Sequence, residues 1–150
     1  MPMIDVYAPV GLFPSDADEQ LGTELTHAVL RAEGHTEAVI PPFFTTNTAA
    51  FVHRLPVVST AAAPSAQVVR VQIITPPGSL DREGQRQITR EATEIVARIA
   101  GDETLTARTW VIIQEAAEGG WGLAGTAFGV EEFTALAQQA AAARAAASNQ

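Results

Sequence analysis

The chain has 150 residues and a formal charge of −8, with nine basic residues, all of them arginine, against seventeen acidic ones. This length suits one domain or two small halves that share a core, and an acidic surface argues against binding to nucleic acid. Because the chain has neither cysteine nor lysine, disulfides, thiolate chemistry and a lysine Schiff base are excluded.

The sequence contains no apolar run of membrane-spanning length, and its start lacks the basic and apolar regions of a signal peptide. These features predict a cytoplasmic protein with no membrane partner. The three histidines, His27, His35 and His53, lack the spacing of metal ligands. We therefore expect no metal site and no cofactor.

Pro2 stands directly before a predicted strand at residues 3–8. Proline fits the first position of a strand because it cannot donate to the sheet ladder, so a purely structural role is one interpretation. The other interpretation requires removal of Met1, which a small second residue usually permits. Pro2 would then carry a secondary amine that could act as a base or a nucleophile.

The first half continues with a break at PVGLFP and a helix predicted from Ser15. Ser15 resembles an N-cap, Leu21 and Leu25 begin an apolar stripe at helical spacing, and Gly34 suits the position after the helix. Residues 38–46, AVIPPFFTT, are predicted to form a second strand, restricted by the two prolines to an edge or a late start.

The second half shows the same order. VVRVQIIT at 68–75 is rich in β-branched residues and predicts a strand. Ser79 is the expected N-cap of a helix whose apolar stripe runs from Ile88 to Ile99, and Gly101 is expected to end it. RTWVIIQE at 108–115 predicts the next strand.

The two halves are an internal repeat. When the chain is shifted by 67 residues, YAPVG at 7–11 falls on ITPPG at 74–78, and Gly34 falls on Gly101. Two further acidic and basic residues match without a gap: Glu24 falls on Glu91 and Arg31 falls on Arg98.

The predicted organisation is one domain over residues 1–150. Repeat one covers about 2–55, an exposed Ala/Pro/Ser linker covers 56–67, repeat two covers about 68–128, and a C-terminal helix covers 131–147. The fold class is α+β: two β-α-β units form one four-stranded sheet with both helices on one face. The opposite face is left bare, which favours an oligomer.

The segment WVIIQEAAEGGWGLAG at 110–125 ends a strand at Glu115 and continues into Gly-Trp-Gly-Leu-x-Gly. Together with Pro2, the two β-α-β units and the length, it resembles the tautomerase superfamily. The segment resembles the end of the 4-oxalocrotonate tautomerase unit. Among the branches of the superfamily, the chain is most similar to the fused, long-chain ones, which include the cis-3-chloroacrylic acid dehalogenases and their relatives. The resemblance covers roughly residues 2–128.

The resemblance implies a homotrimer of the α+β fold that is independent of cofactors and acts on a small molecule. It also implies that the amine of Pro2 is the catalytic general base. Burial in an apolar pocket disfavours the charged form of an amine, so that a neutral amine near pH 7 can accept a proton.

Family tautomerases bind a carboxylate with an arginine in the turn after the first strand, but neither APVGLFP nor TPPGSLD contains one. A second family arginine corresponds to Trp110. Arg108 shares that strand face and is the candidate carboxylate clamp. Arg70 and Arg54 are weaker candidates for substrate binding, and Trp121 matches the aromatic residue that lines the family pocket.

Glu115 and Tyr7 have structural interpretations, as a strand-end carboxylate and a sheet or interface residue, although an acid role for Glu115 stays open. The dehalogenases' helix histidine and strand tyrosine correspond to Val29 and Ile112. The function predicted is a tautomerase that moves a proton between the enol and keto forms of a small 2-keto acid or related carbonyl compound. The alternatives are a non-catalytic trimer that binds a ligand or partner and, less favoured, a dehalogenase or hydratase.

Overall fold

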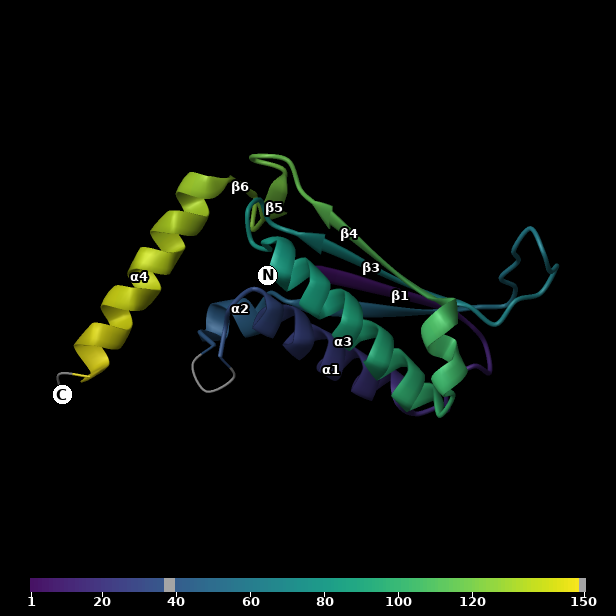
Figure 1. Cartoon of the computed structure of the whole chain (residues 1–150). Helices are drawn as coiled ribbons and strands as arrows, with labels where there is room; N and C mark the ends of the chain where they lie inside the picture. Colours follow the sequence, from purple (N-terminus) through teal and green to yellow (C-terminus); the bar gives the residue numbers. More distant parts are fainter. Residues whose placement is uncertain (37–39, 149–150) are drawn as a thin grey trace.

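A four-stranded mixed sheet carries two helices on one of its faces. The computed structural model describes residues 1–36 and 40–148, and Figure 1 shows the elements. The strands of the sheet are β1 (Met3–Pro9), β2 (Ala49–Leu55), β3 (Val69–Thr75) and β4 (Thr109–Glu115). The order across the sheet is β2-β1-β3-β4, with β1 antiparallel to β3 and the two outer pairs parallel.

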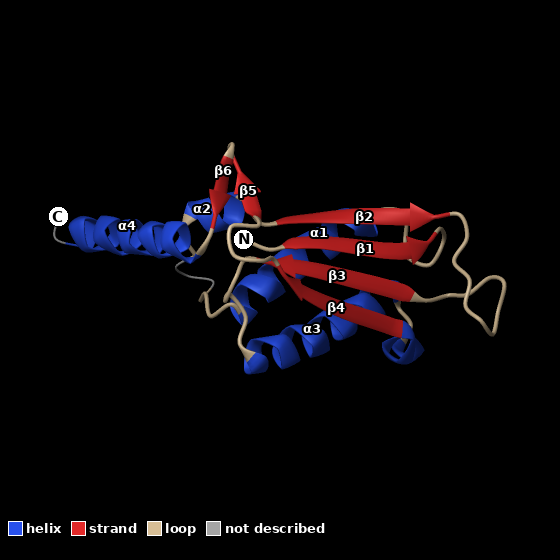
Figure 2. Ribbon diagram, turned by 90° about the horizontal axis from the view of Figure 1, so that it is seen from above, coloured by secondary structure: helices blue, strands red, loops and turns tan. Residues whose placement is uncertain are grey.

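The long helices α1 (Ala17–Ala32) and α3 (Arg82–Ala100) lie side by side over the sheet. Figure 2 shows both on the same side, with the other side of the sheet uncovered. This arrangement confirms the predicted fold class of two β-α-β units with a bare sheet face. The remaining elements are the short helix α2 (Pro42–Thr46), a 3-10 helix at Glu103–Arg108, the hairpin β5 (Trp121–Leu123) and β6 (Thr126–Phe128), and helix α4 (Val130–Ser148).

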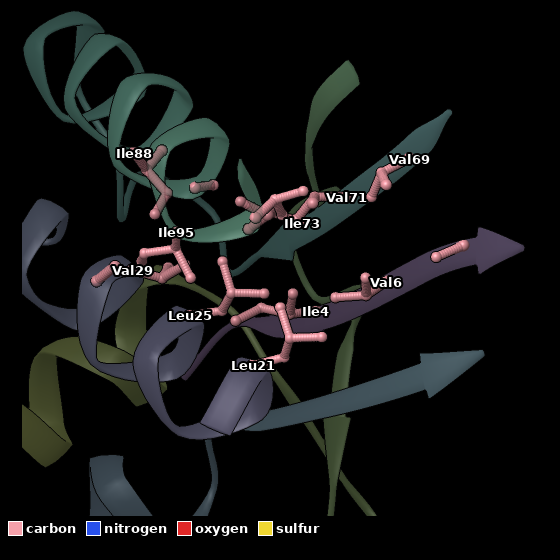
Figure 3. Close-up of a cluster of buried hydrophobic side chains, with 14 of the residues drawn as sticks. Ile4, Val6, Leu21, Leu25, Val29, Val69, Val71, Ile73, Ile88 and Ile95 are labelled. Carbon is pink, nitrogen blue, oxygen red and sulfur yellow. The ribbon is translucent and has the colours of Figure 1, made fainter. Parts of the chain in front are cut away.

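The core lies between the two helices and the sheet. The predicted stripes of α1 and α3 point into it together with alternate residues of β1 and β3, as Figure 3 shows. Fully buried members include Ile4, Val6, Leu21, Leu25, Val29, Val71, Ile73 and Ile88. Because side chains of a strand alternate between its faces, β1 presents Tyr7, β3 presents Arg70 and β4 presents Trp110 to the bare face.

The pseudo-symmetry of the repeat is visible in two reciprocal ion pairs between the helices. Arg31 of α1 pairs with Glu91 of α3 at 3.0 Å, and the matching Arg98 of α3 pairs with the matching Glu24 of α1. Hydrogen bonding to Arg98 lowers the pKa of Glu24 below its ordinary value. The residues related by the 67-residue shift thus form equivalent ion pairs between the two helices.

The strand predicted over residues 38–46 was wrong. Residues 38–39 lie outside the described residues, Pro42–Thr46 forms α2, and the strand that pairs with β1 is Ala49–Leu55. Proline is well suited to the first turn of a helix because its missing N–H has no partner to lose there. The tandem prolines therefore begin a short helix.

Both predicted N-caps were also wrong. Asp16 occupies the N-cap of α1, and its side chain makes no capping hydrogen bond. Asp81 caps α3, accepting a hydrogen bond from the backbone N–H of Gly84 at 2.7 Å. The two glycines expected to end these helices do so: Gly34 and Gly101 have φ of 89° and 68°, a left-handed conformation that costs glycine little.

Candidate active site at the amino terminus

The amino end of the chain lies at one end of the strands of the sheet, where β1 begins and three other segments meet. Because β1 is antiparallel to β3, Met3 pairs with Ile74 and the start of β1 lies beside the end of β3. β4 also finishes at this end of the sheet, and the β5–β6 hairpin follows it. Pro2 is buried there, and its carbonyl accepts a hydrogen bond from the backbone N–H of Ala49 at 3.3 Å.

The terminal amine is itself inside the protein. Met1 is 1% exposed, and its amino nitrogen lies 3.4 Å from Oε2 of Glu33, whose side chain is 3% exposed. Burial lowers the pKa of this amine below its ordinary value, and the Glu33 carboxylate opposes the shift to a smaller extent. An amine at this place is therefore biased toward its neutral, basic form.

A hollow of about 420 Å³ opens beside the amine. Its walls come from the end of α1, from α2, from the turn between β3 and α3, and from the first turns of α4; they include His35, Phe44, Pro76 and Phe133. His35 packs against Phe44 with ring centroids 4.7 Å apart. Burial lowers the pKa of His35, so this imidazole is neutral at neutral pH. The hollow is large enough for a small molecule and mainly apolar.

Trp121 lies at the same end of the sheet as Pro2. It begins β5, is 7% exposed, and lines a smaller hollow of about 240 Å³ with Met3 and Ile74. The structure thus places Trp121, the aromatic residue singled out from the sequence, beside Met3, which follows Pro2. The role of Trp121 toward a substrate stays a prediction.

Arg108 lies at the other end of the strands, directly before β4 begins. Seven residues of β4 separate it from the end that holds Pro2, which is about 20 Å at the rise of a strand. Arg108 donates to Oδ2 of Asp102 at 2.7 Å, to the hydroxyl of Thr104 at 3.0 Å and to the carbonyl of Gln67. Within one chain, Arg108 holds the segment before β4 together and does not reach Pro2.

Arg70 and Arg54 also lie away from Pro2. Arg70 stands on the bare face, with its guanidinium 4.3 Å from the ring centroid of Tyr7. Arg54 points to the helix-covered face, where it pairs with Asp18 of α1. Among the described residues, no arginine lines the 420 Å³ hollow, although the charge of Arg144 contributes to the lowered pKa of His35.

The bare face carries a connected row of side chains that the sequence did not reveal. His53 Nε2 lies 2.6 Å from Oδ1 of Asp5, and its ring stacks on Tyr7 at 4.4 Å between centroids. Arg70 covers the other side of this row, next to the half-exposed Trp110. Polar and stacking contacts between β2 and β1 are followed by a cation–π contact between β1 and β3.

Glu33, Phe44 and Phe133 are the residues at the amino-terminal hollow that the sequence reasoning missed. Glu33 could have been found, because it directly precedes the glycine that ends α1 while its repeat counterpart is Ala100. Phe44 comes from α2, where the second unit has a 3-10 helix in place of an α-helix, and Phe133 comes from α4, which lies outside the repeat. In residues 1–36 and 40–148 no cluster of metal-ligating side chains occurs, and no described helix is long and apolar enough to cross a membrane.

A family model matches the second half of the chain. Residues 68–131 match the family model Tautomerase, described as tautomerase enzyme. No curated protein matches the chain. The match covers the second β-α-β unit and its Gly-Trp-Gly segment.

Solved structures of similar fold cover most of the chain. A wild-type fused 4-OT symmetric trimer shares 15% identity over 87% of this chain and 98% of its own, with a TM-score of 0.70. The macrophage migration inhibitory factor-like protein from Entamoeba histolytica shares 13% over 85% and 98%, with a TM-score of 0.67. N1, a member of the cis-3-chloroacrylic acid dehalogenase family, shares 15% over 90% of each chain, with a TM-score of 0.67.

The chain therefore has the fold of these proteins over 85–90% of its length. Its second unit also carries the sequence pattern of the tautomerase family, and the resemblance inferred from the Gly-Trp-Gly segment is confirmed.

Proposed function

We propose that the protein is a cofactor-independent keto–enol tautomerase in which the amine of Pro2, exposed by removal of Met1, is the general base. One observation carries this proposal: the amino end of the chain is held rigidly at a strand start, buried beside a hollow of about 420 Å³. Removal of Met1 leaves the Pro2 nitrogen facing the space that Met1 occupied.

The reaction needs one group that exchanges protons with both oxygen and carbon. The neutral Pro2 amine accepts the proton of the enol hydroxyl. The C=O bond then forms as the C=C electron pair moves onto the carbon next to the new carbonyl group. The protonated amine then returns its proton to that carbon, which gives the keto form and restores the neutral base. Burial lowers the pKa of the Met1 amine below its ordinary value, and we expect the same burial to favour the neutral, basic form of the Pro2 amine.

The substrate class proposed is a small 2-keto acid or a related carbonyl compound. Trp121 would supply an apolar wall. Arg108 or Arg70 would hold a carboxylate only if another copy of the chain brings it to Pro2, because neither reaches Pro2 within one chain. The site is therefore proposed to be completed in a homotrimer.

The bare sheet face supports the trimer. Phe51, Trp110 and Ile112 are 50%, 52% and 43% exposed on it, which is unusual for one side of a sheet unless another surface covers it. The fused 4-OT structures are named as trimers. We expect Trp110→Asp to convert the oligomer to a smaller species in light scattering, whereas Val57→Asp, at an exposed linker residue, leaves the mass unchanged. A monomeric native chain at micromolar concentration would contradict the trimer.

The test of the base is the ketonisation rate of phenylenolpyruvate by the Met-free chain and by Pro2→Ala. We expect Pro2→Ala to lower kcat/KM about 100-fold, at the lower end of what a general base contributes. The matched control is Pro64→Ala, which changes an exposed proline of the linker that does not line the hollow, and which is expected to stay within threefold. Equal rates for Pro2→Ala and the native chain would refute the role of Pro2.

A second candidate function is ligand or partner binding without catalysis. It is favoured by the position of the arginines, none of which lines the hollow within the described part of one chain. Dehalogenation is disfavoured, because Val29 is buried in the core and Ile112 is a half-exposed apolar residue, so neither can activate water. A chain that binds the enol in equilibrium dialysis yet shows no rate above buffer would support the binding role.

A further inference from the structure

Glu33 combines burial with an unsatisfied charge. Oε2 lies 3.4 Å from the terminal amino nitrogen, while Oε1 is buried and has no hydrogen-bond partner among the described residues. A buried carboxylate normally has its oxygens paired, because each unpaired oxygen loses its hydration without compensation. The amine is therefore the main compensating group for Glu33, and an incompletely satisfied acid stands next to the proposed base.

The packing of α1 does not explain an acid at this position. Glu33 is the C-cap residue of α1, at the negative end of the helix dipole, where a carboxylate is electrostatically unfavourable. The 67-residue shift places Ala100 at the equivalent position of α3. Only the first unit has an amino terminus at that place, because the chain enters the second unit from the linker. The acid therefore occurs in the unit that holds an amine.

We infer that Glu33 is a positioning residue of the amino-terminal amine, whose carboxylate orients the Pro2 nitrogen and stabilises its protonated form. This inference rests on the proposed function for its catalytic meaning. The Pro2 nitrogen is three bonds from the Met1 nitrogen, so it lies no more than about 7 Å from Oε2 of Glu33 by standard bond lengths. Once Met1 is removed, we expect a rotation of the Glu33 side chain to bring the carboxylate closer to the Pro2 nitrogen.

The electrostatic surroundings favour this role. His35, from the segment after α1, lies within the electrostatic influence of Glu33, of the terminal amine and of Arg144 from α4. Glu33 is the anionic member of this group. Its charge raises the pKa of the Met1 amine while burial lowers it, and we expect the same two opposing influences to act on the Pro2 amine.

The experiment measures the amine directly. Met-free chain labelled with ¹⁵N-proline is titrated by ¹⁵N NMR, and the midpoint of the amino-terminal resonance is compared between the native chain, Glu33→Gln and Glu19→Gln. Glu19 is the matched control: it lies on the same helix and its change removes the same charge, but it is exposed and roughly 20 Å away along the helix.

We expect Glu33→Gln to lower the midpoint by about one pH unit and Glu19→Gln to leave it in place. Glu33→Asp, which keeps the charge but shortens the side chain, is expected to give a smaller shift and remains informative if Glu33→Gln does not fold. Midpoints that agree for all folded variants would overturn the inference. Because the titration does not use turnover, it decides the role of Glu33 even if the ketonisation assay fails.

If the tautomerase activity is present, the rising limb of its pH–rate profile reports the same amine. The base must be neutral, so the rate rises with pH through its pKa. Glu33→Gln is expected to move this limb to lower pH. A lower rate with an unmoved limb would mean that Glu33 is structural only.

Discussion

The two β-α-β units share a fold but differ in how closely they follow the common pattern. Gly34 and Gly101 end the two long helices in the same left-handed conformation, and the helices exchange equivalent ion pairs. From Gly34 to Ala49, the partner of Met3, the chain takes 15 residues (49 − 34), but from Gly101 to Trp110, the partner of Arg70, it takes 9 (110 − 101). The first unit is therefore six residues longer there, and it forms α2 where the second unit forms the 3-10 helix Glu103–Arg108.

The difference teaches where the two units have specialised. The second unit is regular, matches the tautomerase family model and ends in the Gly-Trp-Gly hairpin. The family-model match at residues 68–131 lies outside the first unit, yet the first unit supplies the amine, Glu33 and Phe44 of the amino-terminal hollow. The amine and Glu33 thus come from the half that the family model does not cover, whereas Trp121 comes from the half that it does.

The largest expected effect concerns the core that the two units share. Leu25→Ala in α1 and Ile88→Ala in α3 each remove a fully buried side chain, at a cost of about 3 kcal/mol of unfolding free energy. Because both side chains enter one core, we expect each variant to unfold in a single transition in urea. Two separate transitions in either variant would show that the units are independent.

The helix caps should separate the two units more finely. Asp81→Ala removes the hydrogen bond to Gly84 N and is expected to cost about 1 kcal/mol. Asp16→Ala removes no capping hydrogen bond, so its expected effect is smaller by at least half. Chemical denaturation of both variants measures the difference. Equal losses would show that the two N-caps do not differ as described.

The reciprocal ion pairs should give the smallest effect. Arg98→Met, which breaks the pair with Glu24, and Arg31→Met, which breaks the pair with Glu91, are each expected to cost about 0.5 kcal/mol, because all four side chains are partly exposed. Similar losses would support the pseudo-symmetry. A loss above about 2 kcal/mol would assign either arginine a role beyond a surface pair.

The pair between Arg98 and Glu24 also has a defined pH dependence. Arg98 lowers the pKa of Glu24 in the folded state, so the stabilisation is fully present above the unfolded pKa of Glu24 and is lost as pH falls through the folded pKa. We expect the difference in unfolding free energy between the native chain and Arg98→Met to disappear in acid. A difference that persists at pH 2 would contradict this origin.

The sequence predicted most of the fold because its signals were periodic. The apolar stripes of α1 and α3, the β-branched strand β3 and the helix-ending glycines all act locally. The strand at 38–46 failed because Phe43 and Phe44 resemble strand residues, whereas Pro42 suits a helix start and the true strand, β2, is rich in small and polar residues.

The candidate site was predictable only in part. Pro2 and Trp121 are marked by motifs, and the structure brings both to the same end of the sheet. Arg108 was predicted to bind a carboxylate because of the strand face it shares with Trp110. Its distance from Pro2 depends instead on its position along the strand, and it lies at the other end of β4 from Pro2. Glu33 and Phe133 approach the amine from α1 and α4, which no local pattern relates to Pro2.

The most direct measurement is the ketonisation rate of one preparation before and after Met1 is removed. Chain purified with Met1 in place is treated with methionine aminopeptidase, and intact mass gives the cleaved fraction while phenylenolpyruvate ketonisation gives the rate. If the amine of Pro2 is the base, the rate rises in proportion to the cleaved fraction from the level of buffer. A rate that is the same in the uncleaved and cleaved chains would contradict the account.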